Sequence, residues 1–277
     1  IIALYTKYNS RRKPELIEPA TYSLQNFNEA EKMVEDYNSL VIRAKKVEEQ
    51  LPAEALDAFY QLMLYPVEAC ANLNEMYVSA GKNSYYNFQN RASTNHFADK
   101  ARELFFKDTV FTNHYHGLAN GKWNHMMSQT HMGHTSWRDP VYNKMPPVSY
   151  IQPGNQANLG YVVEDGVSRS PWMPGGLKSS SFPSFDPIND QNYYVEIFNM
   201  GQEKLSYTIT TENEWIKLSS QGGTVQYNEK VFLNIDWDNA PSGEDVGEIM
   251  IKADNSEEEI KVSVPIRNDL PENIIGF

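Results

Sequence analysis

The sequence predicts a multidomain α + β protein, with an antiparallel helical bundle followed by an immunoglobulin-like antiparallel β-sandwich. In the first half, apolar residues recur every three or four positions, as on one face of a helix. Near the end they alternate with polar residues, as in half-buried strands, and a stretch rich in Pro, Gly and Ser separates the two patterns. We expect a bundle domain over residues 1–150, a Pro/Gly/Ser-rich linker leading into the sandwich over 151–190, and the sandwich over 191–270.

Length and composition indicate a globular chain of about two domains. The chain has 277 residues, of which 40% are hydrophobic, and Cys70 is the only cysteine, which excludes an internal disulfide. No apolar run reaches the roughly 18 residues of a membrane span, and the first residues lack the apolar core of a signal peptide. We expect no membrane partner. Because the chain lacks an initiator Met and stops on the apolar PENIIGF, we expect a fragment of a longer polypeptide.

The net charge of -12 is unevenly distributed. Residues 1–150 carry 16 Lys+Arg and 16 Asp+Glu, whereas residues 151–277 carry 8 and 20. A nucleic-acid binder normally presents a basic face, so we expect no nucleic-acid partner. A neutral glycan or a protein partner fits this balance better.

The first expected helix begins near Ala30 and ends before Leu51 and Pro52. Its apolar side chains line one face, and three polar residues before it are candidate N-caps. The apolar residues are Met33, Val34, Tyr37, Leu40, Val41, Ala44 and Val47, and the candidate caps are Ser23, Asn26 and Asn28.

Two more helices are expected. The second has Pro52 in its first turn and Gly81 as its C-terminal cap, and Pro66 in its middle predicts a kink. The third is expected over residues 85–105, with a short connection that predicts antiparallel neighbours. The apolar residues of the second are Leu56, Phe59, Tyr60, Met63, Leu64, Val67, Leu73, Met76 and Tyr77, and those of the third are Tyr85, Phe88, Ala92, Ala98, Ala101, Leu104 and Phe105.

Alternation with a period of two predicts strands near the C-terminus. The turn signals Gly222-Gly223, PSGEDVG and DNSEEE separate them at the spacing of an antiparallel sandwich. Pro265 cannot donate to a β-ladder, so we expect its strand at a sheet edge or its nitrogen facing outward. The inward residues are expected to be Leu205, Tyr207 and Ile209; Val231, Leu233, Ile235 and Trp237; and Ile260, Val262, Val264 and Ile266.

The stretch NGKWNHMMSQTHMGHTSW, residues 120–137, first suggests a metal site. It contains no HExxH motif, and Asp139 is the only acidic residue between Thr109 and Val163. We therefore expect no metal, and histidines hydrogen-bonded among aromatic residues. Cys70 is expected to be an inert buried thiol, and no GxSxG motif is present. The histidines considered are His114, His116, His125, His131 and His134.

Recognition suits this stretch better than catalysis. Hydrolysis of a glycosidic bond usually needs two carboxyl groups about 5 to 9 Å apart, and the bundle's glutamates fall mainly on a polar helix face. We expect no catalytic residue and no cofactor in this chain. Tryptophan faces suit a sugar ring and polar side chains suit its hydroxyls, although both Trp and Met also fill cores. The candidate residues are Trp123, Asn124, His125, Gln129, His131 and Trp137.

Four long motifs occur in order between Tyr8 and Pro147. They are YNSRRKPELIEPATYSL, LPAEALDAFYQLMLYPVEACANLNEMY, QNRASTNHFADKARELFFKD and NGKWNHMMSQTHMGHTSWRDPVYNKMPPV. Together they resemble glycoside hydrolase family 115, the xylan alpha-glucuronidases, in the region after the catalytic barrel. A looser resemblance to the family's following sandwich runs on to Arg267 and includes NIDWDNAPSG.

The resemblance implies a large secreted or periplasmic enzyme whose catalytic carboxylates lie in a barrel that precedes Ile1. The expected partners are then that barrel domain of the same polypeptide, xylan or a glucuronoxylan oligosaccharide, and a second copy of the chain in a homodimer. Arg11 and Arg12 are candidates for pairing with a uronate carboxylate. The alternative for these arginines is pairing with Glu15 or with the surface of their own domain.

Three functions remain open from the sequence. The first is a non-catalytic helical plus β-sandwich segment that supports or covers the active site of a xylan-debranching alpha-glucuronidase. The second is a stand-alone carbohydrate-binding or adhesion module. The third is a histidine-metal hydrolase. The aromatic residues Tyr193, Tyr194, Trp215 and Trp237 offer a sugar-binding face, but we expect them to fill the space between two sheets.

Overall fold

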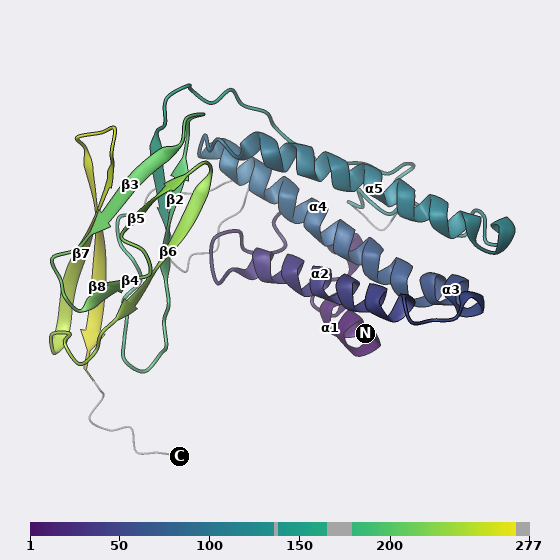
Figure 1. The fold of residues 1–277 in the computed structure, drawn as a ribbon, viewed down its shortest axis with the longest axis horizontal. Helices are drawn as coiled ribbons and strands as arrows, with labels where there is room; N and C mark the ends of the chain where they lie inside the picture. The colour runs from purple at the N-terminus through teal and green to yellow at the C-terminus, as the bar shows by residue number, and fades with distance from the viewer. Residues whose placement is uncertain (136–137, 165–178, 270–277) are drawn as a thin grey trace, which may run out of the picture. The chain divides into compact units, whose positions relative to one another are not determined.

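The computed structural model describes residues 1–135, 138–164 and 179–269, in which a helical region is followed by a β-sandwich of two antiparallel sheets (Figure 1). This confirms the expected fold class. The described residues form two compact units. The helical unit comprises Ile1–Tyr85 and Thr94–Tyr150, and the sandwich unit comprises Tyr86–Ser93 and described residues from Ile151 onward. Within the described residues, no helix combines the length and hydropathy needed to cross a membrane.

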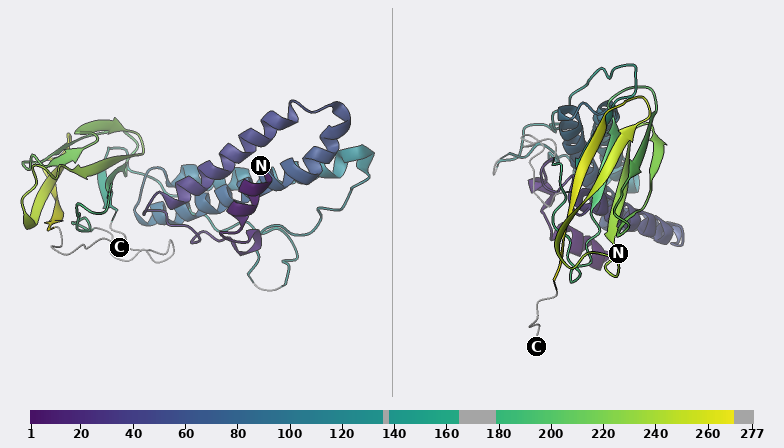
Figure 2. Two further views of the ribbon diagram at one scale, coloured as in Figure 1. Left: turned by 90° about the horizontal axis from the view of Figure 1, so that it is seen from below. Right: turned by 90° about the vertical axis from the view of Figure 1, so that its left-hand side faces the viewer.

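The helical unit is built around α2, α4 and α5, which lie side by side (Figures 1 and 2). Successive long helices run in opposite directions, as in an antiparallel bundle. The elements are α1 (Ile2–Asn9), the 3-10 helix η1 (Pro14–Leu16), α2 (Glu29–Glu48), α3 (Ala53–Phe59), the π-helix η2 (Tyr60–Leu64), α4 (Tyr65–Phe88) and α5 (Thr94–Gly121).

The α2 helix confirms the expected amphipathic pattern, since its buried residues are Ala30, Met33, Tyr37, Leu40 and Ala44. Its start differs in detail from a simple N-cap. Asn28 occupies the N-cap position with a φ of 49° and makes no capping hydrogen bond through its side chain. The Ser23 hydroxyl instead accepts a hydrogen bond from the backbone N–H of Asn26, which orders the turn before the helix.

The irregularity expected at Pro66 lies upstream of it. Residues Tyr60–Leu64 form a π-helical turn, and α4 begins at Tyr65. Pro66 has no N–H to donate to the preceding turn, and the wider π turn is an alternative way to absorb that loss. Pro66 directly follows this π turn, and the backbone remains helical across it, since Phe59 and Tyr65 on either side of the turn both have right-handed helical angles.

Gly81 does not cap the second helix, because α4 continues through it to Phe88. A side chain at Gly81 would collide with the backbone carbonyl of Pro19, so this glycine permits a close approach of two segments. The third helix begins at Thr94, not near Tyr85. The chain breaks between these helices, and Asn90 in the break has a φ of 53°.

The sandwich consists of two four-stranded sheets with the orders β1-β2-β6-β4 and β5-β3-β7-β8. Every strand pair is antiparallel. The strands are β1 (Leu159–Val163), β2 (Tyr194–Asn199), β3 (Leu205–Thr210), β4 (Ile216–Leu218), β5 (Gly222–Val225), β6 (Asn228–Ile235), β7 (Gly243–Ala253) and β8 (Glu259–Asn268).

The core between the sheets contains the inward residues that the alternating pattern predicted. Leu205, Tyr207 and Ile209 are buried in β3 while their neighbours Thr208 and Thr210 are exposed. Three of the four aromatic residues expected in this core pack there, and Tyr194 does not. Trp215 is 5% exposed, and Tyr193 and Trp237 pack against the same cluster. Tyr194 is buried on the other face of β2, edge-on to Phe232.

One turn expectation is wrong. Gly222-Gly223 lies in β5, paired with Thr208 and Tyr207, and is not a turn. A side chain at Gly222 would meet the Tyr207 carbonyl, so glycine allows the strands to approach closely. The stretch expected to lead into the sandwich contains β1, which pairs with β2.

Pro265 confirms the edge prediction. Its strand, β8, lies at the end of its sheet, and its carbonyl accepts a hydrogen bond from the N–H of Phe185 on the side away from β7. The segment 179–186 covers this edge through further bonds to Ser263 and Arg267. These hydrogen bonds pair backbone N–H and C=O groups of β8 that would otherwise be left unpaired at the edge of the sheet.

Candidate functional site

The candidate residues follow the C-terminal end of α5, where the helix is interrupted. Leu118, Ala119 and Asn120 have non-helical backbone angles, and His125 also has a positive φ of 69°. The Asp57 carboxylate accepts a hydrogen bond of 2.9 Å from the N–H of Ala119. The chain therefore leaves the helix at a fixed point and forms a turn over residues 122–128. A loop follows, called the loop 129–144, of which residues 129–135 and 138–144 are described.

In the turn, Trp123 is half-buried and packs against the cluster of Tyr60, Leu64, Tyr65 and Tyr115. The Lys122 ammonium lies 4.8 Å from the centre of the indole ring, which is within the range of a cation–π contact. Trp123 is thus partly a core residue and partly a surface one.

Asn124 and His125 are exposed beside Trp123. The Asn124 side-chain oxygen accepts a 3.0 Å hydrogen bond from the N–H of His125, and Ser128 Oγ lies 3.5 Å from His125 Nδ1. The His116 ring holds the turn, since its Nε2 accepts from the N–H of Met127 at 3.1 Å. The structure therefore brings Trp123, Asn124 and His125 together on one turn.

The loop is closed by polar side chains within it. The Gln129 amide donates to Asp139 at 2.8 Å, and His134 Nε2 lies 3.4 Å from the same carboxylate. The Asn143 side-chain oxygen accepts hydrogen bonds from the N–H groups of His131 and Met132, at 2.7 and 3.1 Å. Gln129 and His131 are consequently occupied in ordering the loop.

His131 also pairs with a carboxylate that lies outside the stretch. Its Nδ1 is 3.0 and 3.1 Å from the two oxygens of Asp108, whose side chain is 7% exposed. A carboxylate beside Nδ1 favours the form with a proton on that nitrogen. Met132, which follows His131, is 1% exposed and packs against Leu73, Met76, Tyr77 and Leu104. The contact between His131 and Asp108 anchors the loop to α5.

Arg11 and Arg12 lie in a different part of the helical unit. Arg11 is 3.0 Å from the Asp36 carboxylate and donates to Met33 Sδ, both in the α2 helix. Arg12 donates from Nε to the carbonyl of Leu16 at 3.0 Å. Both guanidinium groups are therefore engaged with their own domain. The sixth candidate of the stretch, Trp137, lies outside the described residues.

The histidines do not gather with other ligands. Within residues 1–135, 138–164 and 179–269, no three His, Cys, Asp or Glu side chains are grouped closely enough to hold a metal ion. His114 stacks on Tyr60 at 4.0 Å between ring centres. Cys70 is buried, and burial raises the pKa of its thiol, as expected for an inert cysteine.

Two buried carboxyl groups do lie on one face of a sheet, in the sandwich unit. Glu164 and Glu196 are diagonal neighbours across the β1–β2 ladder and are 4% and 5% exposed. Both oxygens of Glu196 already have partners, since Oε2 lies 2.9 Å from Arg91 and Oε1 accepts from Asn228 at 2.8 Å. Glu196 is therefore part of a buried ion pair, and is unsuited to act as a free acid or base.

Comparison with known proteins finds similarity among solved structures, while no protein-family model and no curated protein matches the chain. A family GH115 4-O-methyl-alpha-glucuronidase, BtGH115A, with specificity for decorated arabinogalactans is 15% identical, with a TM-score of 0.38. The match covers 95% of this chain, which spans 38% of that enzyme. A FixG-related protein from Vibrio parahaemolyticus matches 43% of this chain and 100% of its own, at 13% identity and a TM-score of 0.28. A PapD-like domain of human CEP192 matches 49% of this chain and 99% of its own, at 11% identity and a TM-score of 0.28.

The sequence reasoning missed Asp108 and Asn143. Asp108 lies four residues after Leu104, on the buried face of α5. An acidic residue at a core position of a helix indicates that it has a partner, because an unpaired carboxylate is rarely buried. The four-residue spacing from Leu104 could have revealed this position in the sequence. Asn143 offered no such signal, because a polar loop residue can point anywhere. Its role depends on how the loop returns to His131.

Proposed function

We propose that the chain is a non-catalytic helical plus β-sandwich segment of a xylan-debranching alpha-glucuronidase, in which it supports or covers the active site of a barrel domain. The proposal rests first on the four ordered motifs between Tyr8 and Pro147. The partner would be the barrel domain of the same polypeptide, with xylan or glucuronoxylan contacted at the turn of Trp123, Asn124 and His125.

One structural observation carries the non-catalytic part of the proposal. Asp108 and Asp139, two carboxylates that contact the loop, each hold loop side chains in place. Glycoside hydrolysis needs one carboxyl group to give a proton and a second to act as base or nucleophile. A surface with half-exposed Trp123 beside exposed Asn124 and His125 suits contact with a sugar or a protein better than it suits this reaction.

The test is an assay of the whole chain on glucuronoxylan, with release of glucuronic acid and its methyl ether measured by anion-exchange chromatography. We expect no release above the buffer control. Turnover that scales with protein concentration would overturn the proposal. Sequencing the gene on both sides of the segment is the companion test, since a barrel-encoding sequence before Ile1 is expected, and a start codon there with a stop codon after Phe277 would contradict it.

The second candidate is a stand-alone carbohydrate-binding or adhesion module. A groove in the sandwich unit whose lining includes Asn155, Gln156 and Asn158 favours it, because such a groove can bind a ligand without a barrel. Calorimetry of the chain with xylo-oligosaccharides distinguishes the two when combined with the gene sequence. Binding by a chain encoded between its own start and stop codons supports the stand-alone module.

A further inference from the structure

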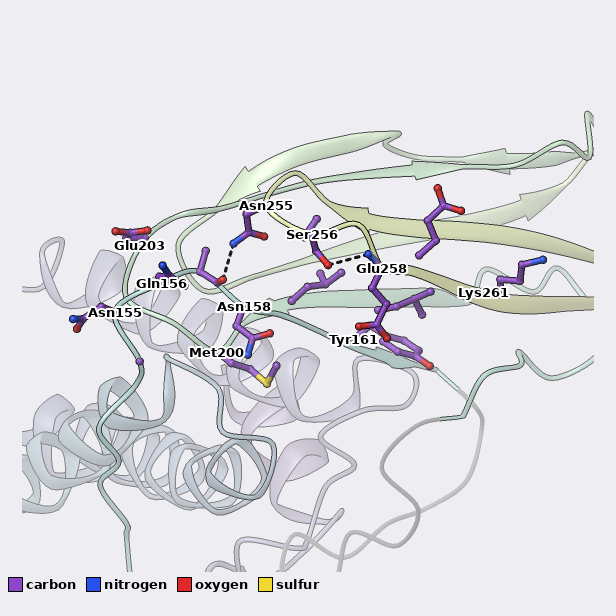
Figure 3. A pocket seen from close by; sticks show the side chains of 16 residues that line it. Asn155, Gln156, Asn158, Tyr161, Met200, Glu203, Asn255, Ser256, Glu258 and Lys261 are labelled. Carbon is purple, nitrogen blue, oxygen red and sulfur yellow. Dashed lines mark hydrogen bonds between the residues drawn. The ribbon is translucent and has the colours of Figure 1, made fainter.

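A groove of about 1170 Å³ lies in the sandwich unit between the loop 154–158, which leads into β1, and the hairpin that joins β7 to β8 (Figure 3). Asn155 and Glu203 lie at one end of the view and Lys261 at the other. All of the residues that line it belong to the sandwich unit. It is separate in sequence from the turn and loop described above.

The backbone around the groove is held firmly. The carbonyl of Asn158 accepts from the N–H of Met200 at 2.8 Å, and the carbonyl of Asn155 accepts from the N–H of Glu203 at 3.0 Å. Across the groove, the Asn255 amide donates to the carbonyl of Ala157 at 2.9 Å, which ties the hairpin to the loop. A ligand would therefore meet a largely preformed surface, which lowers the entropy cost of binding.

Side-chain amides dominate the loop wall of the groove. Asn155, Gln156 and Asn158 are exposed, and the described hydrogen bonds of Asn155 and Asn158 use backbone atoms. Each amide offers both a donor and an acceptor to a ligand. A pair of sugar hydroxyl groups can use both at once. The wall therefore suits a ligand with many hydroxyl groups.

Apolar residues also line the groove. Leu159 and Ile260 are half-buried, and Tyr161 is 6% exposed and belongs to the sandwich core. A pyranose ring has an apolar face of C–H groups and a rim of hydroxyl groups. Its two kinds of surface match apolar residues and amides in one site.

Charge decides between classes of ligand. Three exposed carboxylates, Glu203, Glu258 and Glu259, line the groove, together with the exposed ammonium of Lys261. Negative groups would be repelled by this excess of negative charge. The groove therefore disfavours phosphates and uronic acids, and it favours a neutral or positively charged ligand.

We propose that this groove binds a neutral oligosaccharide. A positively charged extended peptide is the competing occupant, because β8 is an edge strand next to the groove. The segment 179–186 already occupies the β8 edge from Ser263 onward, so only the start of the strand, near Glu259 and Lys261, borders the groove. Addition of a strand needs a longer run of unpaired backbone groups than this, which favours the sugar.

The test is a titration of the whole chain with xylohexaose, in which binding is measured by calorimetry and by changes in the amide chemical shifts in NMR spectra. We expect saturable binding with shifts in residues 154–158 and 255–261. Gln156→Ala should weaken binding about fivefold, as expected for one neutral hydrogen bond, and Asn158→Ala should act similarly. Gln221→Ala is the matched control, because Gln221 is an exposed glutamine of the same unit outside the groove, and it should leave the affinity unchanged.

A charged sugar and a basic peptide complete the test. A xylotetraose bearing glucuronic acid should bind more weakly than xylotetraose at low salt, and the difference should shrink as salt rises. The proposal is overturned if xylohexaose, cellohexaose and mannohexaose all fail to bind. It is also overturned if binding is unaffected by both groove variants, or if hexalysine shifts the groove residues and the sugars do not. These outcomes do not depend on whether the chain is part of a glucuronidase.

Discussion

Arg91 and Glu196 form an ion pair inside the sandwich unit, with 2.9 Å between Arg91 Nη1 and Glu196 Oε2 and side-chain exposures of 0% and 7%. The guanidinium carbon also lies 3.9 Å from the ring centre of Phe198 and 4.1 Å from that of Tyr86. Residues 86–93, which belong to the sandwich unit, are thereby fixed to β2 within that unit, and the N–H of Ala92 donates to the carbonyl of Asn199.

We predict that Arg91→Ala lowers the free energy of unfolding of the sandwich unit by about 3–5 kcal/mol, because it leaves the Glu196 charge buried without its partner. Lys217→Ala is the matched control. Lys217 also pairs with a carboxylate of the sandwich unit, that of Asp236, but its side chain is 56% exposed, so the loss should stay below about 1 kcal/mol. Urea unfolding followed by hydrogen exchange of the β2 amides measures both. Equal losses in the two variants would contradict the prediction.

We predict that Asp108→Asn loosens the loop 129–144 while α5 stays folded. The variant removes a charge-assisted hydrogen bond to His131 at a site with 5% exposure, which should cost about 1.5–3 kcal/mol of local stability. Faster hydrogen exchange and earlier proteolytic cleavage within the loop are the measurements. Asp139→Asn is the control, since its side chain is 56% exposed and a smaller effect is expected. Unchanged exchange in Asp108→Asn would show that the pair does not hold the loop.

We predict that Asp186 stabilises the sandwich unit at neutral pH and ceases to do so in acid. Hydrogen bonds from the Asn189 side chain and backbone, together with others from Gln191 and Ile188, lower its pKa from 3.8 to about 2. A lowered folded-state pKa means that the contribution is complete above about pH 4 and is lost as the pH falls towards 2. Asp186→Asn should therefore be less stable than the parent at pH 7, by less than about 1 kcal/mol near the surface.

Denaturant midpoints at pH 7, 4 and 2 check the Asp186 prediction. The difference between the parent and Asp186→Asn should shrink between pH 4 and pH 2. Asp190→Asn, an exposed aspartate of the same turn, is the control, and it should track the parent throughout. A constant difference across the three pH values would refute the assignment.

We predict that Cys70 reacts with thiol reagents only after unfolding. Burial raises the pKa of its thiol, so the reactive thiolate is scarce, and the Sγ lies in contact with the Tyr5 hydroxyl at 3.7 Å. Native protein with an aromatic disulfide reagent at pH 8 should show little absorbance change, and denatured protein should show one equivalent. Ser128→Cys supplies an exposed thiol that should react at once. Equally fast reaction of the native parent would mean that this part of the bundle opens readily.

Periodicity predicted most of the fold because burial imposes it. The face of α2 and the alternation in β3 follow from which side chains leave water, and that information is local. The failures occur where a distant backbone decides the local structure. Gly81 continues a helix because Pro19 approaches it, and Gly222 lies in a strand because Tyr207 approaches it.

The candidate site was predictable as a stretch and not as a network. Trp123, Asn124 and His125 were identified by residue type alone, and the structure places them on one turn. Their neighbours depend on long-range packing. His131 meets Asp108 from 23 residues away, and the groove combines a loop near residue 156 with a hairpin near residue 256. A pattern within a short stretch of sequence cannot predict contacts between residues that are so far apart in the chain.

The π turn at Tyr60–Leu64 fixes the rotational phase between α3 and α4. One residue corresponds to about 100° around an α-helix, so a turn with one extra residue offsets everything before it by that angle. Deleting a single residue from this turn would leave one uninterrupted helix whose first two turns are rotated away from their present neighbours. Tyr60 and Leu64 are both buried in the turn itself, so the packing around them would be the first to be disturbed by such a deletion.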